Sequence, residues 1–323
     1  MRPSIAFCKL SGSGNDFICI DNRDGRYDAM LAEAEWIGHF ARSLCRRSLG
    51  IGADGIVFAL APEPQMDAFA DVAARFLEAD GSETDLCGNG TACFVRWAVE
   101  RGIVPDGEVK ILTSAGVVRG SILDEDRYVR VCIPLPEDMR TDVELDVAGA
   151  KLTCDYIVTG IEHVVTYVDD IGAVDVAHLG PLIRHHRHFD QPKGVNASFV
   201  EVLGPGELAI RTYEYGVEAE TLACGTGSAA AAILAAARFG WWDQYATGQQ
   251  PIRVRAPSGD VLRVLFETDP DGRINDLCLD TRVRCTYAGE VCPDLTRLSL
   301  TRPGAAAADV PAGCRPAPDP CSA

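Results

Sequence analysis

The sequence lacks any long apolar run and any excess of positive charge. No segment approaches the roughly 18 apolar residues that a membrane-spanning helix needs, and residues 1–17 hold no continuous apolar core of the secretory kind. The 47 acidic residues outnumber the 30 Lys and Arg residues, which are scattered, and the net charge is -17. Such a chain repels a phosphate backbone. We expect a cytoplasmic protein without membrane or nucleic-acid partners.

Closely spaced cysteine pairs are also missing. The thirteen cysteines include no C-x-x-C pair and none of the short spacings that hold zinc. Free thiols in a reducing compartment are therefore expected. A histidine cluster is present at His185, His186 and His188, but the flanking Arg184 and Arg187 would repel a cation. We interpret the cluster as a solvated loop and predict no metal site.

The composition is that of a folded protein with ordinary core-forming capacity. The chain has 323 residues, of which 47% are hydrophobic and 24% charged, with a mean hydropathy of +0.03. This length suits two domains of about 150 residues. Short strands bounded by turn residues dominate; examples are 17–21, 109–112, 128–133, 163–168 and 261–266. Two buried helices are predicted at 91–101 and 228–239, each followed by a capping glycine (Gly102, Gly240), and a surface helix at 29–46.

The C-terminal segment differs from the rest of the chain. Residues 302–323 hold five prolines and seven alanines with little else that is apolar. Such a segment cannot bury enough surface to become ordered. We predict a disordered tail that contains Cys314 and Cys321, and the segment 292–301 has no clear prediction.

An internal repeat carries the chemistry. Residues 83–92 and 220–229 share the pattern E-T-x-x-C-G-x-G-S/T-A, and each copy directly precedes one of the two predicted buried helices. Each copy therefore places a cysteine, Cys87 or Cys224, at a helix N-terminus. The repeat indicates a duplicated domain with a pseudo-twofold axis.

A helix start of this kind binds anions. Its unpaired N–H groups and positive dipole end attract a carboxylate, and glycine lets a ligand come close. The same field can lower a cysteine pKa from about 8.5 to between about 3.5 and 7.5. The turn residues expected to bind substrate are Gly88, Asn89, Gly225 and Thr226.

Two such sites facing each other suit inversion of a stereocentre. One cysteine, as thiolate, would remove the α-hydrogen of an amino acid while the other returns a proton to the opposite face. The alternative is a pair of tight turns with buried, inert cysteines. Because two matched motifs each open a helix, we favour the catalytic interpretation.

Together with these motifs, the sequence blocks 11–17, 49–55, 79–83, 114–116, 192–196 and 220–227 occur in the order typical of diaminopimelate epimerases. The chain resembles that family over about residues 7–291. The resemblance implies an α+β fold of two pseudo-symmetric domains, each a mostly antiparallel barrel-like sheet around a central helix. The expected domains are 1–128 and 129–281, with a strand at 282–291 that returns to the first domain.

The resemblance also implies roles for particular residues. Cys87 and Cys224 would be the two bases of a cofactor-independent, pyridoxal-phosphate-free mechanism. His163 and Glu214 would tune the thiols, and the substrate-holding asparagines map onto Asn15 and Asn196. The implied partner is a small-molecule amino acid, and a homodimer is the candidate assembly.

Several positions depart from the family pattern. Glu78 stands in place of an asparagine, Tyr215 in place of an arginine that grips the distal carboxylate, and Ala92 in place of another arginine; Gly160–His163 keeps only the ends of its motif. Tyrosine cannot replace a bidentate arginine at a carboxylate. We therefore predict an amino-acid substrate other than diaminopimelate, with a cationic side chain near Glu78. Diaminopimelate, which has a distal ammonium group, is the alternative.

Three other interpretations fit parts of the sequence. A non-catalytic relative that binds amino acids, or that senses redox state by joining its two cysteines, has the same motifs. Proline racemases also use paired cysteines, but their signatures do not match these blocks. Gly12 to Gly14 lacks the complete G-x-G-x-x-G spacing of a dinucleotide site and reads as a turn before the strand at Phe17.

Overall fold

The computed structural model describes residues 4–62, 69–123, 127–189 and 194–292. The expected tail at 302–323, with Cys314 and Cys321, and the segment 293–301 lie outside these ranges. Residues Met1–Pro293 form one unit by their contacts. The expected domain boundary near residue 128 falls inside this unit, between two halves that are best described by their strand pairings.

The N-terminal half consists of strands around one principal helix. Its elements are β1 (Ile5–Gly12), β2 (Asn15–Asp21), α1 (Asp28–Leu31), α2 (Ala34–Cys45), β3 (Gly55–Leu60), β4 (Val72–Glu78), β5 (Glu83–Thr84), α3 (Gly88–Glu100), β6 (Glu108–Thr113), β7 (Gly116–Ile122) and β8 (Tyr128–Cys132).

The C-terminal half repeats this order. Its elements are β9 (Glu137–Val147), β10 (Ala150–Val158), β11 (Glu162–Tyr167), η1 (Ile171–Ala173), α4 (Val176–Arg184), η2 (Arg187–Phe189), β12 (Asn196–Gly204), β13 (Glu207–Glu214), β14 (Ala219–Glu220), α5 (Gly225–Arg238), α6 (Trp242–Tyr245), β15 (Ile252–Arg255), β16 (Val261–Thr268) and β17 (Ile274–Val291).

Equivalent strands pair in the same way in both halves. The antiparallel pairs β1–β2, β3–β4, β4–β5 and β6–β7 correspond to β10–β11, β12–β13, β13–β14 and β15–β16. The parallel pairs β2–β3 and β4–β6 correspond to β11–β12 and β13–β15. The fold is thus α+β, with two pseudo-symmetric and mostly antiparallel halves, as expected.

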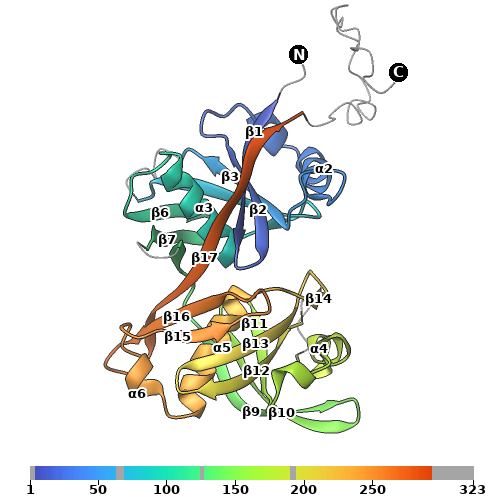
Figure 1. Cartoon of the computed structure of the whole chain (residues 1–323), viewed down its shortest axis with the longest axis vertical. Coiled ribbons are helices and arrows are strands. Elements are labelled where there is room, and N and C mark those ends of the chain that lie inside the picture. Colours follow the sequence, from blue (N-terminus) through green and yellow to red (C-terminus); the bar gives the residue numbers. More distant parts are fainter. Residues whose placement is uncertain (1–3, 63–68, 124–126, 190–193, 293–323) are drawn as a thin grey trace, which may run out of the picture. The chain divides into compact units, whose positions relative to one another are not determined.

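Each half encloses its principal helix in strands (Figure 1). Helix α5 is buried over almost its whole length and is built largely from alanine. A helix that is apolar on all sides must be buried, and small side chains let strands approach it from several directions. Helix α3 lies against β1, β2, β7, β8 and β17. The packing of strands around both helices therefore fixes the positions of their N-terminal ends.

Strand β17 connects the two halves. It pairs with β16 of the C-terminal half and with β8 and β1 of the N-terminal half. Figure 1 shows it as the long red strand that runs from one group of strands to the other. Leu279 of this strand is buried beside the start of α5, close to Gly225.

The helices differ in extent from the sequence-based prediction. The expected helix at 29–46 is wrong as a single element, because Glu33 has an extended backbone (φ -108°, ψ 107°) and separates α1 from α2. The central helices begin at Gly88 and Gly225, against predicted starts at 91 and 228. The expected capping glycines Gly102 and Gly240 do have left-handed φ values of 65° and 72°.

One expectation about the cysteines is also corrected. Cys132 and Cys278 are joined by a disulfide, so these two are not free thiols. They lie directly opposite each other on β8 and β17, which brings their sulfurs together although 146 residues separate them in the chain. Asp276 lies beside them and would complete a three-ligand group, but the sulfurs are bonded to each other and offer no thiolate to a metal.

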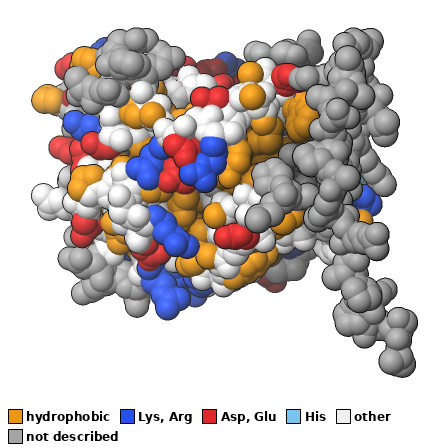
Figure 2. All heavy atoms as spheres, turned by 90° about the horizontal axis from the view of Figure 1, so that it is seen from above, with side chains coloured by type: hydrophobic (Ala, Val, Ile, Leu, Met, Phe, Trp, Pro, Cys, Tyr) orange, Lys and Arg blue, Asp and Glu red, His pale blue; other side chains and the backbone are white. Residues whose placement is uncertain are grey.

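The surface mixes charges of both signs. Figure 2 shows basic and acidic side chains beside one another on the face seen from above, with hydrophobic side chains between them. The excess of acidic residues therefore does not make this face uniformly negative. Among the described residues, no helix is both long and apolar enough to span a membrane.

Candidate active site

The repeated motifs place Cys87 and Cys224 at the N-caps of α3 and α5. Both residues have extended backbones, with φ and ψ of -129° and 115° at Cys87 and of -116° and 111° at Cys224. The first turn closes identically in both helices: Thr91 N donates to Cys87 O at 2.7 Å, and Ser228 N donates to Cys224 O at 2.9 Å. The hydroxyl of each of these residues donates to the same carbonyl at 2.8 Å. The S/T of the motif thus fixes the helix start.

The second glycine of each motif makes room beside the cysteine. A Cβ atom at Gly227 would lie 3.1 Å from the Cys224 sulfur and 3.3 Å from the His163 ring, and one at Gly90 would lie 3.1 Å from the Phe17 ring. Gly227 N also donates to the Cys224 sulfur at 3.3 Å. A larger residue at Gly227 would therefore press on both the sulfur and the imidazole ring.

Burial, rather than the helix dipole, dominates the pKa of both thiols. Burial raises the pKa of Cys87 to about 12 and the pKa of Cys224 well above its usual range. The carboxylates of Glu78 and Glu214 add to the shift at Cys87, and that of Glu214 adds to the shift at Cys224, while nearby backbone amides oppose both shifts. The expected lowering of the pKa at a helix start is therefore wrong, because burial outweighs the helix dipole at both cysteines.

Cys224 is surrounded by His163, Thr226 and Glu214. His163 is fully buried, its Nε2 lies 3.0 Å from Thr226 Oγ1, and burial lowers its pKa to about 3, so the ring is neutral. Burial raises the pKa of Glu214, although hydrogen bonds with Thr221 and with the Cys224 thiol oppose the shift. A carboxyl group in contact with the thiol can exchange a proton with it.

Cys87 has polar neighbours of another kind. Asn89, two residues further on, donates from Nδ2 to Asn15 Oδ1 at 2.7 Å, and Asn15 Nδ2 in turn donates to Asp54 Oδ2 at 3.5 Å. The predicted residues Asn15 and Asn89 are therefore brought together at the start of α3. Their amides form one chain that ends at a carboxylate.

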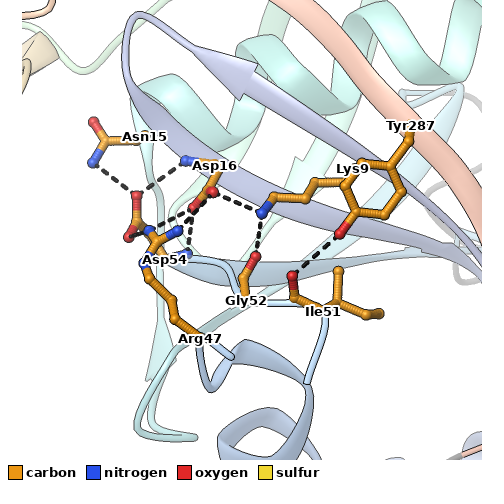
Figure 3. A network of polar contacts seen from close by, with 8 residues as sticks. All are labelled: Lys9, Asn15, Asp16, Arg47, Ile51, Gly52, Asp54 and Tyr287. Atoms are coloured by element: carbon orange, nitrogen blue, oxygen red, sulfur yellow. Dashed lines mark hydrogen bonds and ion pairs between the residues drawn. The ribbon is translucent and has the colours of Figure 1, made fainter. Parts of the chain in front are cut away.

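An ionic network holds Asn15 and Asp54 in place (Figure 3). Lys9 Nζ lies 2.8 Å from Asp16 Oδ2, and Arg47 contacts Asp16 at 3.0 Å and Asp54 at 2.9 Å. Asp16 N donates to Asp54 Oδ2 at 3.0 Å, and Asp54 N donates to Asp16 Oδ1 at 2.9 Å. Burial opposes ionisation of Asp16, but the hydrogen bonds from Arg47 and Lys9 lower its pKa overall. Sequence reasoning missed this network because its members lie in separate segments.

The two halves meet at these helix starts. Asn89 Oδ1 lies 3.7 Å from the Cβ position of Gly225, and the Leu222 side chain packs against Gly14 of the β1–β2 turn. Asn89 Oδ1 and His163 Nδ1 are buried without a hydrogen-bond partner among the described residues. Buried polar atoms of this kind call for a partner, and a bound amino acid would provide hydrogen-bonding groups for them.

Asn196 and Tyr215 form a second cluster. Asn196 Oδ1 accepts from Tyr215 N at 2.8 Å, and its Nδ2 donates to Glu162 O at 3.3 Å, so its side chain holds two turns together. The Arg184 guanidinium lies over the Tyr215 ring at 4.6 Å and binds Glu218 at 3.0 Å. Sequence reasoning treated Arg184 only as a flank of the histidine cluster and missed this contact, for which no local signal exists.

The geometry can be compared with known proteins. A hydroxyproline epimerase from Agrobacterium vitis superposes with a TM-score of 0.67 at 16% identity, covering 90% of this chain and 94% of that one. A probable proline racemase from Agrobacterium radiobacter K84 superposes with a TM-score of 0.64 at 19% identity, covering 89% and 92%. The Aquifex aeolicus protein named diaminopimelate epimerase is 39% identical over 269 residues, which are 82% of this chain and 91% of that protein.

The fold and these relatives define an isomerase of the racemase and epimerase class. The family model described as diaminopimelate epimerase matches residues 7–133 and 156–273. The chain belongs to the diaminopimelate epimerase family.

Proposed function

We propose that the protein inverts an amino-acid α-carbon by a two-base mechanism in which Cys87 and Cys224 act on opposite faces, without pyridoxal phosphate. One observation carries the proposal: two pseudo-symmetric halves each present a cysteine as the N-cap of a buried helix, and the two helix starts approach each other. A carboxylate between these helix starts would be bound by backbone N–H groups from both sides.

The reaction follows from this arrangement. The thiol on one side loses its proton to a neighbouring carboxylate and, as thiolate, takes the α-hydrogen of the substrate. The opposite thiol donates its proton to the other face of the carbon, so one proton leaves and one arrives. The carbanion is stabilised because its charge spreads into a carboxylate already held by the helix dipoles. Substrate binding also brings an ammonium group, which favours the thiolate that burial disfavours.

The relatives favour diaminopimelate as the substrate, rather than the amino acid with a cationic side chain that the departures from the family pattern predict. The Aquifex aeolicus relative bears that name, and its alignment covers most of both chains. The position of Arg184 supports this candidate, because its guanidinium lies over the Tyr215 ring while it is ion-paired with Glu218. We propose that Arg184 and Tyr215 together receive the distal carboxylate.

A basic amino acid is the second candidate, favoured by the acidic character of the site. Glu78 is near enough to Glu214 and Asp54 for their charges to raise its pKa, and it also acts on Cys87. An ammonium or guanidinium group would be attracted by these carboxylates, and a second carboxylate would be repelled.

Deuterium incorporation tests both candidates. The enzyme is incubated in deuterated water with LL- and meso-diaminopimelate, lysine, ornithine and arginine, and α-deuterium is measured by mass spectrometry. We expect incorporation and inversion of at least one of these substrates, unaffected by added pyridoxal phosphate or chelator. A kcat/KM for diaminopimelate above all others supports the first candidate, and a higher value for a basic amino acid supports the second. Binding without deuterium incorporation would identify a non-catalytic relative.

A further inference from the structure

Glu78 and Glu214 occupy equivalent positions in the two halves. In the N-terminal half, Leu77 pairs with Glu83 on β5, and Glu78 N donates to Ser82 O at 2.9 Å. In the C-terminal half, Tyr213 pairs with Glu220 on β14, and Glu214 pairs with Ala219. Counted back from the two cysteines, Glu83 and Glu220 are the same residue of the motif, and so are Ser82 and Ala219. Each cysteine therefore has a glutamate at the end of the equivalent strand of its half, β4 or β13.

The equivalent of His163, by contrast, cannot carry a proton. His163 on β11 packs against Gly227, and Phe17 on β2 packs in the same way against Gly90. The strand register agrees. Phe17 pairs with Gly55, which pairs in turn with Glu78. His163 pairs with Asn196, and the residue after Asn196 pairs with Tyr213, the residue before Glu214. Cys87 thus has a phenyl ring where Cys224 has an imidazole.

The symmetry of the fold points to a role for Glu78: it is the residue that takes up and returns the Cys87 proton, as Glu214 does for Cys224. This inference rests on the proposed two-base function. Glu78 acts through Cys87 and is a positioning residue that sets the protonation state of the thiol. The proton of Cys87 passes to the Glu78 carboxylate, which leaves a thiolate and a neutral carboxyl group. After Cys87 has taken the α-hydrogen, the carboxyl group releases its proton to solvent. Cys224, which has given its proton to the carbon, receives one from solvent through Glu214, so one proton leaves and one returns in each turnover.

Two features of the surroundings favour this exchange once the ammonium group of a bound substrate lowers the pKa of Cys87, which burial and the charge of Glu78 raise. Burial and the charges of Asp80, Glu214 and Asp54 raise the pKa of Glu78 to about 7. The charge of Glu78 also raises the pKa of two thiols, that of Cys87 at the N-cap of α3 and that of Cys45 in α2. Glu78 is nevertheless exposed to solvent, so the proton has a way out. A group that titrates near neutral pH is well matched to a proton-transfer task.

This role differs from recognition of a cationic side chain, and steady-state kinetics separate the two. A recognition residue changes KM for basic substrates, whereas a residue that generates the thiolate changes kcat for every substrate. Glu78 must be ionised to accept the proton, so activity should fall as pH drops through about 7.

The test uses the full chain with the substrate that the wild type turns over best. We expect Glu78→Gln to lower kcat at least tenfold, with KM changed less than threefold, and to remove the acidic limb of the pH profile near 7. Glu78→Asp should retain that limb and recover part of the rate. Asp80→Asn is the matched control, because it removes a neighbouring carboxylate from the same turn. It should keep the maximal kcat within about twofold and keep the limb, moved to lower pH because the charge of Asp80 helps to raise the pKa of Glu78.

Each other outcome overturns the inference. Unchanged kcat in Glu78→Gln, with or without a change in KM, shows that the residue does not generate the thiolate. A lower kcat with the acidic limb still present shows a structural role only. Inactive wild-type enzyme would instead contradict the proposed function, since the deuterium experiment on the unmodified protein comes first.

Discussion

The two cysteine sites share a backbone and differ in their neighbours. At Cys224, the sulfur accepts the Gly227 amide as a cap, and a neutral His163 and Thr226 complete a dry environment. At Cys87 the residue is half-buried, the backbone amides of Gly90 and Asn89 donate to the sulfur, and the side-chain amides of Asn89 and Asn15 are joined at the start of the helix. One duplicated motif therefore supports two different surroundings.

This difference shows which features the chemistry requires of both halves. Both sites keep the helix start, the first-turn hydroxyl, the close-packed glycine and the glutamate at the strand end. The histidine occurs only in the C-terminal half, and the network of Lys9, Asp16, Arg47 and Asp54 orders the asparagine only in the N-terminal half. Under the proposed mechanism, the shared features serve proton transfer, and the unshared ones hold each half in place.

The largest effect is expected from removing either sulfur. Cys87→Ala and Cys224→Ala should each lower kcat/KM for inversion by about 10²- to 10⁴-fold or more, because each thiol serves one face of the carbon. Circular dichroism of the substrate and α-deuterium incorporation measure the loss. Cys→Ser at either position should leave slow or one-sided exchange.

Cys285→Ser provides the control for this prediction. Cys285 is exposed on β17, next to Cys8, and its removal should leave the rate within about twofold. Full turnover by either alanine variant would contradict the two-base scheme. Equal loss in the Cys285 variant would show that the effect of removing a sulfur is not confined to the paired motifs.

The local parts of the site could be predicted from the sequence. The motif encodes the cysteine N-cap, the hydroxyl that closes the first turn and the glycine beside the sulfur within six residues of one another, and the same pattern occurs twice. Gly102 and Gly240 were likewise predictable, because a helix end needs a residue that tolerates a positive φ. The family resemblance then supplied the fold, since its blocks span most of the chain.

What depends on distant contacts could not be predicted. The pKa direction of the cysteines was wrong because burial depends on the whole fold, whereas the helix start is visible locally. The disulfide between Cys132 and Cys278 depends on the pairing of β8 with β17, and the contact of Arg184 with Tyr215 depends on how α4 packs. The equivalence of Glu78 and Glu214 became visible only from the strand register, because the loops that follow them differ in length.

A smaller effect is expected when one site is made to resemble the other. His163→Phe gives Cys224 the aromatic neighbour that Cys87 has in Phe17 and removes one hydrogen bond to Thr226. Because burial keeps this histidine neutral, with a pKa of about 3, it carries no proton at neutral pH. A lost hydrogen bond of about 1 kcal/mol lowers kcat/KM by roughly fivefold to tenfold.

Kinetics between pH 5 and 9 check this expectation, with Thr226→Val as a second variant. It removes the same hydrogen bond from the other side, together with the 3.6 Å contact of Thr226 Oγ1 with the Cys224 sulfur. Thr226→Val should lose at least as much activity as His163→Phe, and His163→Phe should keep the wild-type pH profile. A loss above about 10²-fold in His163→Phe alone, with a changed profile, would show that the imidazole itself transfers a proton.

The smallest expected effect concerns the first glycine of each motif and is measured as stability. A Cβ atom at Gly88 would meet nothing within 4 Å, whereas one at Gly225 would lie 2.8 Å from Leu279 Cδ2. Gly88→Ala should raise the free energy of unfolding by about 0.4–1 kcal/mol, since alanine restricts the unfolded chain. Gly225→Ala should lower it by about 1–3 kcal/mol, because Leu279 is buried and the contact is overpacked. Midpoints of urea unfolding, at unchanged slope, decide between these signs. Shifts of the same sign and size in both variants would mean that the two helix starts are equally free of their surroundings, contrary to the close contact of Gly225 with β17.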